Sequence, residues 1–332
     1  VRREVVRILT PGTVIDPAFL DERENNYVLA LSEKNVWSIA YADITTGELK
    51  TTLFDPEKGT DRVLEEILKV KPSEIIVSKG FESLHNNIML TLSGEGYTLT
   101  AVPDAYFDPH QAAPLIRRVY GVLSLEGLGL APESAQLAAV GGLLAYIEET
   151  QKVDLRHFEQ IQVYQTGQFM MLDKFAWRNL EIVETLRDKR KRGSLLWVLD
   201  QTATSMGGRR LRQWLERPLL AAEEIERRLE TVDLFVNDLI LRSEVRELLK
   251  SVYDLERLSS KLVFGTVNAR DLLALKASLA VLPDLKAILS DADATLLNQL
   301  RGEIDPLEDI YELIERAIED EPPISIKEGG LI

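Results

Sequence analysis

One carboxylate in the sequence stands where metal-dependent enzymes often carry a metal ligand. Asp43 lies in YADITTGEL (41–49), where a predicted strand ends before a Thr-Gly turn. Two-metal phosphoryl chemistry needs about three or four converging acids, and Glu48, Glu74 and Asp104 lie near the edges of predicted strands. An aspartate at a tight turn also has ordinary structural reasons to be there. A metal-dependent nuclease centred on Asp43 and a purely structural Asp43 are therefore both open hypotheses.

Other residue types that could do chemistry are absent or scattered. The chain has no cysteine, which excludes disulfides, thiolate metal sites and a cysteine nucleophile. Three histidines lack a second ligand at the helical spacing of zinc sites: His85, His110 and His157. Neither GxxxxGK[ST] nor GxGxxG occurs. The glycine pairs at 141–142 and 207–208 lie inside helical patterns and are interpreted as sites of close helix packing. We therefore predict no catalytic, cofactor-binding or metal-binding residue in this chain.

Two cationic runs could contact phosphate. The first is RDKRKR (187–192), and its candidate phosphate contacts are Arg187, Lys189, Arg190, Lys191 and Arg192. The second is GGRRLRQWLER (207–217), where Arg209, Arg212 and Gln213 lie opposite an apolar stripe that includes Trp214. Solvated surface is the commoner role for such runs, so binding of a DNA backbone remains an alternative and Trp214 is predicted to be core.

Composition limits the class of protein. Of 332 residues, 45% are apolar and 28% charged, which is typical of a globular protein with about two domains. The formal net charge of −15 argues against strong DNA binding by this chain, because such binding depends on cations that displace counterions. No stretch has the roughly 18 apolar residues of a membrane span. The absence of cysteine is compatible with a cytoplasmic protein.

The elements that would position these residues fall into two groups. Strand patterns at 26–32, 36–44, 49–54, 74–78 and 97–102 alternate with helical patterns, which predicts an α/β domain with a mixed sheet. A helix broken or shortened around Pro114 follows at 111–123, then a longer helix at 132–152. From Asn179 onward the sequence reads as capped helices, with Ser194, Thr204 and Asn268 as N-caps, so the second domain is predicted to be all-α.

Six ordered strings resemble the MutS family of bacterial DNA mismatch-repair proteins. They are RREVVRILTPGT (2–13), YADITTGEL (41–49), AAVGGLLAYIEETQK (138–152), MLDKFAWRNLEI (171–182), GSLLWVLDQTATSMGGRRLRQWLERPL (193–219) and ERAIEDEPPISIKEGGLI (315–332). Because they occur in order along the whole chain, the chain is identified as an internal fragment of a member of this family. The resemblance implies a remnant of the link to a mismatch-binding domain (1–12), an RNase H-like connector domain (13–150) and the first, incomplete part of a helical core or lever domain (151–332).

The resemblance also implies a function without chemistry in this chain. In the family, connector and core relay ATP-driven changes between the ATPase and the DNA-binding parts, and the connector offers a docking surface for MutL. By analogy, the candidate MutL contacts are Gln111, Leu115 and Arg118. Mismatched duplex DNA, dimerisation, ATP and Mg²⁺ are expected to involve mainly parts of the full-length protein outside this chain. The alternatives stay open: an RNase H-like nuclease at Asp43, or a DNA-backbone binder.

Overall fold

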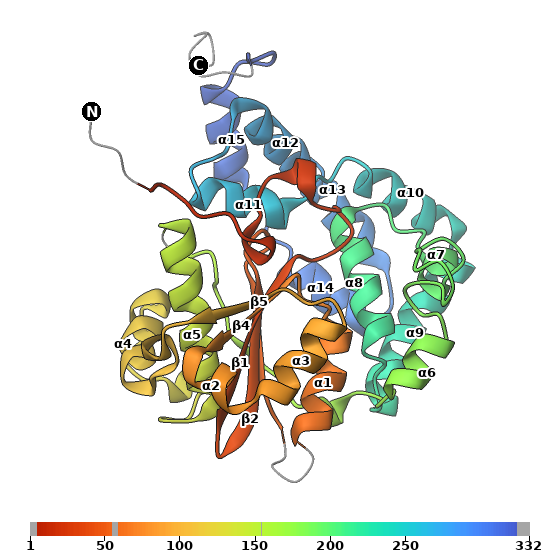
Figure 1. Cartoon of the computed structure of the whole chain (residues 1–332). Coiled ribbons are helices and arrows are strands. Elements are labelled where there is room, and N and C mark those ends of the chain that lie inside the picture. Colours follow the sequence, from red (N-terminus) through yellow and green to blue (C-terminus); the bar gives the residue numbers. More distant parts are fainter. Residues whose placement is uncertain (1–4, 55–58, 154, 324–332) are drawn as a thin grey trace. The chain divides into compact units, whose positions relative to one another are not determined.

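The computed structural model describes residues 5–54, 59–153 and 155–323 (Figure 1). The chain divides into two compact units, residues 1–167 with 171–177 and residues 168–170 with 178–332. Two predicted segments lie partly outside the described residues: the start of the remnant at 1–12 and the end of the motif at 315–332.

Six strands form one mixed sheet in the first unit. They are β1 (Tyr27–Lys34), β2 (Val36–Asp43), β3 (Glu48–Phe54), β4 (Glu74–Ser78), β5 (Leu99–Val102) and β6 (Gln162–Val163). Their order is β5-β4-β1-β2-β3-β6. The three strands β1, β2 and β3 form an antiparallel meander, whereas β4 and β5 add in parallel on one side and β6 adds in parallel on the other.

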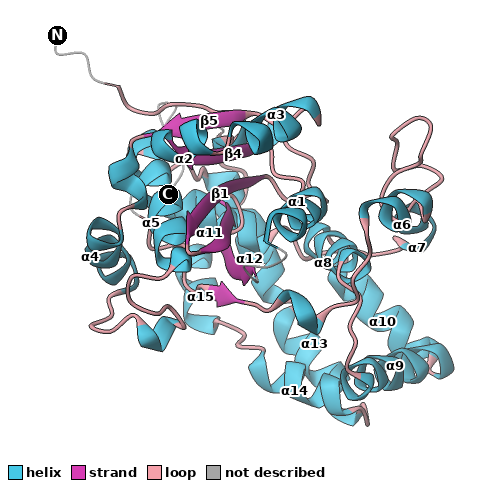
Figure 2. Ribbon diagram, turned by 60° about the horizontal axis from the view of Figure 1, so that its bottom comes forward, coloured by secondary structure: helices cyan, strands magenta, loops and turns pink. Residues whose placement is uncertain are grey.

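Helices cover both faces of this sheet (Figure 1). On one face lie α1 (Gly59–Val70), α2 (Lys79–Leu84) and α3 (Asn86–Gly94), and on the other lies α5 (Ala135–Gln151), with α4 (Pro109–Tyr120) packed on it. Figure 2 shows the strands between these helices. Because both faces are covered, the first six residues of β1 are all buried and the strand reads as a nearly continuous apolar run.

The second unit is built from helices. They are α7 (Leu195–Leu199), α8 (Ser205–Glu216), α9 (Ala222–Asn237), α10 (Leu239–Leu249), α11 (Leu255–Val263), α12 (Ala269–Ala280), α13 (Leu282–Ile288), α14 (Thr295–Glu303) and α15 (Glu308–Ala317). The short helix α6 (Lys174–Asn179) spans the division between the units. A small core forms where α10, α13 and α14 meet, around Val245, Leu285 and Leu297. Ser194, Thr204 and Asn268 cap α7, α8 and α12, which confirms the predicted N-caps.

The predicted fold class, an RNase H-like mixed α/β domain followed by helices, is confirmed. One helix prediction is wrong: α4 continues through Pro114. Proline removes one backbone hydrogen bond, but Asp108 caps the start of α4, Gly121 ends it with φ of 64°, and its inner face packs on α5. These interactions offset the missing bond.

The division between the units falls later in the chain than the predicted boundary at residue 150. Phe158 is buried, and Gln162 and Val163 pair with β3, so the segment after α5 completes the sheet before the chain enters the helical unit.

Candidate functional site

Asp43 ends β2 as a fully buried carboxylate whose oxygens are already occupied. One oxygen accepts hydrogen bonds from the Asn25 side chain (2.9 Å) and the Asn26 N–H (3.1 Å), and the other from the Thr45 N–H (2.8 Å) and hydroxyl (2.7 Å). Burial raises the pKa of Asp43, and these four hydrogen bonds lower it in part. The arrangement holds the turn into β3, as the structural hypothesis expects.

Glu74 begins β4 and is also buried and fully engaged. One oxygen accepts from the Thr10 hydroxyl (2.5 Å) and the Gly12 N–H (3.1 Å), and the other from the hydroxyls of Thr100 (2.6 Å) and Tyr146 (2.7 Å). Glu74 therefore joins the N-terminal segment, β5 and α5. Because four donors from these segments bind its carboxylate, the role of Glu74 is structural.

The four candidate acids do not converge. Asp43 pairs across the sheet with Glu48, and directly opposite residues point to the same face. Glu74 pairs with Val28, which points to the other face because it is adjacent in β1 to the partner of Asp43. Asp104 is exposed and accepts from the Gly80 N–H. Among the described residues, no three His, Cys, Asp or Glu side chains lie close enough to hold a metal ion.

The predicted partner-contact residues share one side of α4. Gln111 and Arg118 are exposed and Leu115 is half-buried, as their i, i+4 and i+7 spacing requires on a helix packed on one side. We call these three residues the α4 row. The structure thus brings them together on one surface.

The buried side of α4, with Ala112 and Ile116, is fitted tightly to α5. A Cβ added at Gly141 would lie 2.1 Å from the Ala112 Cβ, and one added at Gly142 would lie 2.8 Å from the Phe107 ring. The first glycine pair therefore has the predicted packing role. It allows α4 to approach α5 closely.

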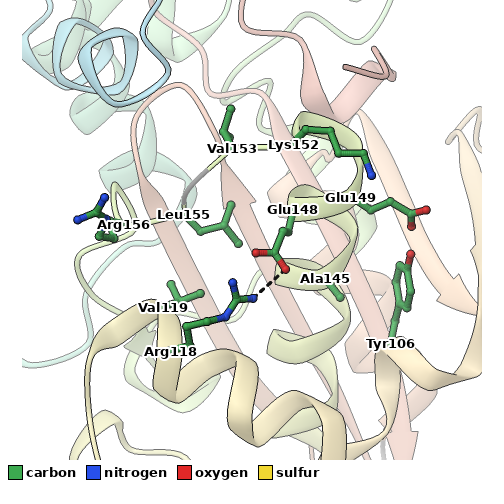
Figure 3. Close-up of a pocket in the computed structure, with 10 residues that line it drawn as sticks. All are labelled: Tyr106, Arg118, Val119, Ala145, Glu148, Glu149, Lys152, Val153, Leu155 and Arg156. Carbon is green, nitrogen blue, oxygen red and sulfur yellow. Dashed lines mark hydrogen bonds and ion pairs between the residues drawn. The ribbon is translucent and has the colours of Figure 1, made fainter. Parts of the chain in front are cut away.

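A pocket of about 790 Å³ opens where the C-terminal ends of α4 and α5 lie side by side (Figure 3). It is lined by Tyr106, Arg118, Val119, Ala145, Glu148, Glu149, Lys152, Val153, Leu155 and Arg156. Arg118 reaches across its mouth to Glu148, with nitrogen and oxygen 2.9 Å apart. The last residue of the α4 row is thus also a pocket residue.

The sequence interpretation missed the other charged residues of this pocket. Glu148, Glu149 and Lys152 close the helix that was predicted at 132–152, and Arg156 follows it. Charged residues gathered at the end of an otherwise buried helix were the available signal. Their proximity to Arg118 depends on the parallel packing of α4 on α5, which no local pattern specifies.

The first cationic run forms an exposed loop before α7. Arg187, Lys189, Arg190 and Arg192 are exposed. Lys191 is half-buried and forms an ion pair at 2.8 Å with Asp200, the C-cap of α7, so its charge is already paired. Lys189 stays exposed while it pairs with Glu184 at 3.4 Å, so four of the five candidate phosphate contacts are exposed and one of these four is in an ion pair.

The second cationic run differs from its predicted role. Arg209 is buried and forms a two-pronged ion pair with Asp254 (2.7 and 2.8 Å) and a further contact with Glu256 (2.6 Å). Arg212 pairs with Glu216 at 2.9 Å. The prediction that Trp214 is core was wrong: its side chain is 38% exposed and lies under the Arg228 guanidinium, 3.9 Å from the ring centre.

The histidines have separate surroundings. His85 contacts the rings of Trp37 and Phe81 and pairs with Glu33 at 2.5 Å, whereas His110 is exposed at the start of α4. His157 lies against Phe158.

Within the described part of the chain, no helix has the length and apolar character needed to cross a membrane.

Comparison with known proteins gives matches along almost the whole chain. Residues 26–159 match the family model of MutS domain II, and residues 176–332 match that of MutS domain III. Over its full length, the chain is 42% identical to the DNA mismatch repair protein MutS of Acetivibrio thermocellus and 38% identical to that of Symbiobacterium thermophilum, covering 38% of each. It is 41% identical to the MutS of Staphylococcus saprophyticus, of which it covers 35%. The chain thus spans little more than a third of the relatives it matches.

Proposed function

Because the chain belongs to the MutS family, of which it matches domains II and III, we propose that it acts in DNA mismatch repair as a relay and docking module. In this proposal the α4 row is the contact for MutL, and the chain itself breaks no bonds. It would act in the bacterial cytoplasm, where the DNA is.

The observation that carries the docking proposal is the contrast between the two sides of α4. One side carries the α4 row, in which Gln111 and Arg118 are exposed and Leu115 is half-buried. The inner side is locked onto α5 at Gly141 and Gly142, so the row is held without the loss of conformational freedom that ordering a loop would cost. A surface of this kind suits recognition of a protein partner.

The relay proposal rests on α5. This helix is buried along most of its length, and its end is tied to the N-terminal segment through the Ile8 N–H to the Thr150 carbonyl (2.7 Å) and the Gln151 side chain to the Ile8 carbonyl (3.1 Å). Coupling between distant sites needs rigid elements with discrete arrangements. A rigid α5 would carry movement of the segment at Ile8 to α4 and its bound partner.

The proposed absence of bond-breaking chemistry is supported by the acids of the sheet. The side chains of Asp43 and Glu74 point to opposite faces of the sheet, and both carboxylates accept hydrogen bonds from other residues of the chain. Both observations argue against the nuclease alternative. In the family, ATP and Mg²⁺ belong to a separate ATPase domain. We propose that this nucleotide site, the mismatch-reading site and the main dimer interface all lie outside domains II and III.

A hydrogen-exchange footprint tests the docking proposal. Addition of the cognate MutL to the chain should slow exchange at the backbone amides of α4 and leave α3, on the other face of the sheet, unchanged. Protection confined to the helical unit would place the contact elsewhere and contradict the proposal.

A second candidate function is contact with a DNA backbone through the loop before α7. The observation that favours it is the exposure of Arg187, Lys189, Arg190 and Arg192 on one loop. Titration with plain duplex DNA at two salt concentrations tests it, because phosphate contacts weaken steeply as salt rises. Binding that is absent at low salt, or unchanged when Arg190 and Arg192 become glutamine, would exclude this function.

A further inference from the structure

An exposed ion pair joins the α4 row to the end of α5. The Arg118 guanidinium donates to a carboxylate oxygen of Glu148 at 2.9 Å, across the mouth of the pocket at the C-terminal ends of the two helices (Figure 3). The two side chains are 63% and 38% exposed. The described residues that line the pocket all belong to the first unit, whose sheet has helices on both faces. The pair is therefore a property of this unit by itself.

The exposure of this pair makes it easy to exchange for another contact. Exposed ion pairs add little to stability, because both charges are well hydrated when they separate and salt screens their attraction. The pair of Arg209 with Asp254 differs, since the Arg209 side chain is 3% exposed and its separation would leave a buried charge. Arg118 can instead turn from Glu148 to a partner with little loss of stability.

The contact with Glu148 also shows which chemical group this position accepts. A guanidinium presents its N–H groups in a planar fork, which fits a carboxylate better than a neutral acceptor. Lys152 and Arg156 add positive charge to the same lining, and Val119 and Val153 add apolar surface for the carbon atoms of a bound side chain. These residues fit an acidic side chain of a protein partner.

Negative groups at the pocket argue against the phosphates of DNA as the occupant. Glu148 and Glu149 follow each other near the end of α5, and the carbonyl groups at the C-terminal ends of α4 and α5 add partial negative charge. A DNA backbone would bring several phosphates close to these groups, whereas a single carboxylate needs only to take the place of Glu148. The lining therefore favours a protein partner.

We propose that the Arg118–Glu148 ion pair is autoinhibitory: Glu148 occupies the Arg118 guanidinium until an acidic side chain of MutL displaces it. This inference rests on the proposed docking of MutL on α4. It adds the chemical group that MutL presents to Arg118 and the internal group with which MutL competes. Because only molecules in which Arg118 has left Glu148 are ready to bind, Glu148 lowers the affinity of the chain for MutL.

The affinity of the whole chain for its cognate MutL, measured by isothermal titration calorimetry, tests the proposal. Glu148→Gln should tighten binding about threefold, because exposed ion pairs shift an equilibrium by a factor of this size. Glu149→Gln is the matched control, since it makes the same charge change at the next position, where the side chain points away from Arg118 (Figure 3). The control should change the affinity less than about 1.5-fold. Unchanged or weaker binding by Glu148→Gln would overturn the proposal.

A second background separates competition for Arg118 from a general effect of charge. In Arg118→Gln, the further change Glu148→Gln should alter the affinity less than about 1.3-fold, because the group for which Glu148 competes has been removed. A gain of equal size in both backgrounds would contradict the proposed competition.

The same measurements distinguish this proposal from the docking proposal on which it rests. If Arg118→Gln weakens binding and Glu148→Gln does not tighten it, MutL docks on α4 without competition from Glu148. If neither change alters the affinity and α4 gains no protection from hydrogen exchange, the docking proposal itself is wrong. Duplex DNA that gains as much affinity from Glu148→Gln as MutL does would identify a phosphate as the occupant and overturn the assignment of a carboxylate.

Discussion

Gly141 on α5 and Ala112 on α4 lie so close that a Cβ at residue 141 would stand 2.1 Å from the Ala112 Cβ. No rotation of a side chain can relieve this contact, because both atoms are fixed to the backbone. The close approach fixes the spacing of α4 and α5 at this point, which is what a rigid docking helix requires.

Gly141→Ala should force α4 away from α5 and lower the free energy of unfolding by about 1–3 kcal/mol, the usual cost of overpacking a core. Denaturant unfolding measures this loss. Gly94→Ala is the control, because nothing lies within 4 Å of a Cβ added at that helical glycine. It should be neutral or stabilising by up to about 1 kcal/mol. Equal effects of the two substitutions would show that the helices are not tightly fitted.

Glu74→Ala should destabilise the first unit by at least about 3 kcal/mol, because four donors lose their acceptor in a buried site. The N-terminal segment should loosen first, since Thr10 and Gly12 both depend on this carboxylate. Hydrogen exchange at the Gly12 amide reports the effect. Glu159→Ala, at an exposed position, should leave that exchange rate unchanged. Slow exchange of the Gly12 amide that persists in the Glu74→Ala variant would show that Glu74 does not hold the N-terminal segment in place.

Asp43→Asn should affect stability and its pH dependence, with no loss of any nuclease activity. The amide places an N–H₂ group against two of the four donors, which should cost about 1–3 kcal/mol. Burial raises the folded-state pKa of Asp43 above its usual value of 3.8, so the folded protein binds this proton more tightly than the unfolded chain. The contribution of the carboxyl group is therefore fully present below 3.8 and is lost as pH rises through the raised pKa.

Urea unfolding at a series of acidic pH values measures this dependence. The stability advantage of the natural chain over the Asp43→Asn variant should widen as pH falls. A stability advantage that narrows as pH falls would contradict a raised pKa of Asp43 in the folded protein. Mn²⁺-dependent DNA cleavage that disappears in the variant would instead revive the nuclease hypothesis.

Arg209→Ala should cost about 3–5 kcal/mol in the helical unit, because the substitution leaves Asp254 and Glu256 without their buried partner. Arg209→Lys should recover only part of the loss, since an ammonium group cannot reproduce the two-pronged contact with Asp254. The exposed neighbour Arg210 provides the control, and Arg210→Ala should change stability by less than about 0.5 kcal/mol. Thermal unfolding of the three variants separates these outcomes.

Much of the fold could be predicted because its signals are local. Apolar residues along β1 and β2 and the caps at Ser194, Thr204 and Asn268 depend on neighbours a few positions away. The exposure of Gln111 and Arg118 likewise follows from helical spacing within α4.

The remaining features depend on contacts between distant parts of the chain. Glu74 owes its role to Thr10 and Tyr146, which lie 64 and 72 positions away. Arg209 is buried because Asp254, 45 positions later, comes to meet it. Trp214 has the spacing of a core residue, yet 38% of it stays exposed among the residues that the structure describes. Patterns within one helix cannot specify such partners.

The affinity of the whole chain for its cognate MutL is the sharpest test of the proposed docking on α4. Arg118→Glu reverses a charge in the α4 row, and Arg117→Glu makes the same change in the same helical turn, outside the row. We expect Arg118→Glu to weaken binding at least about tenfold, a loss of about 1.4 kcal/mol, and Arg117→Glu to change it less than about twofold. Equal affinities for both variants and the natural chain would contradict the proposed docking.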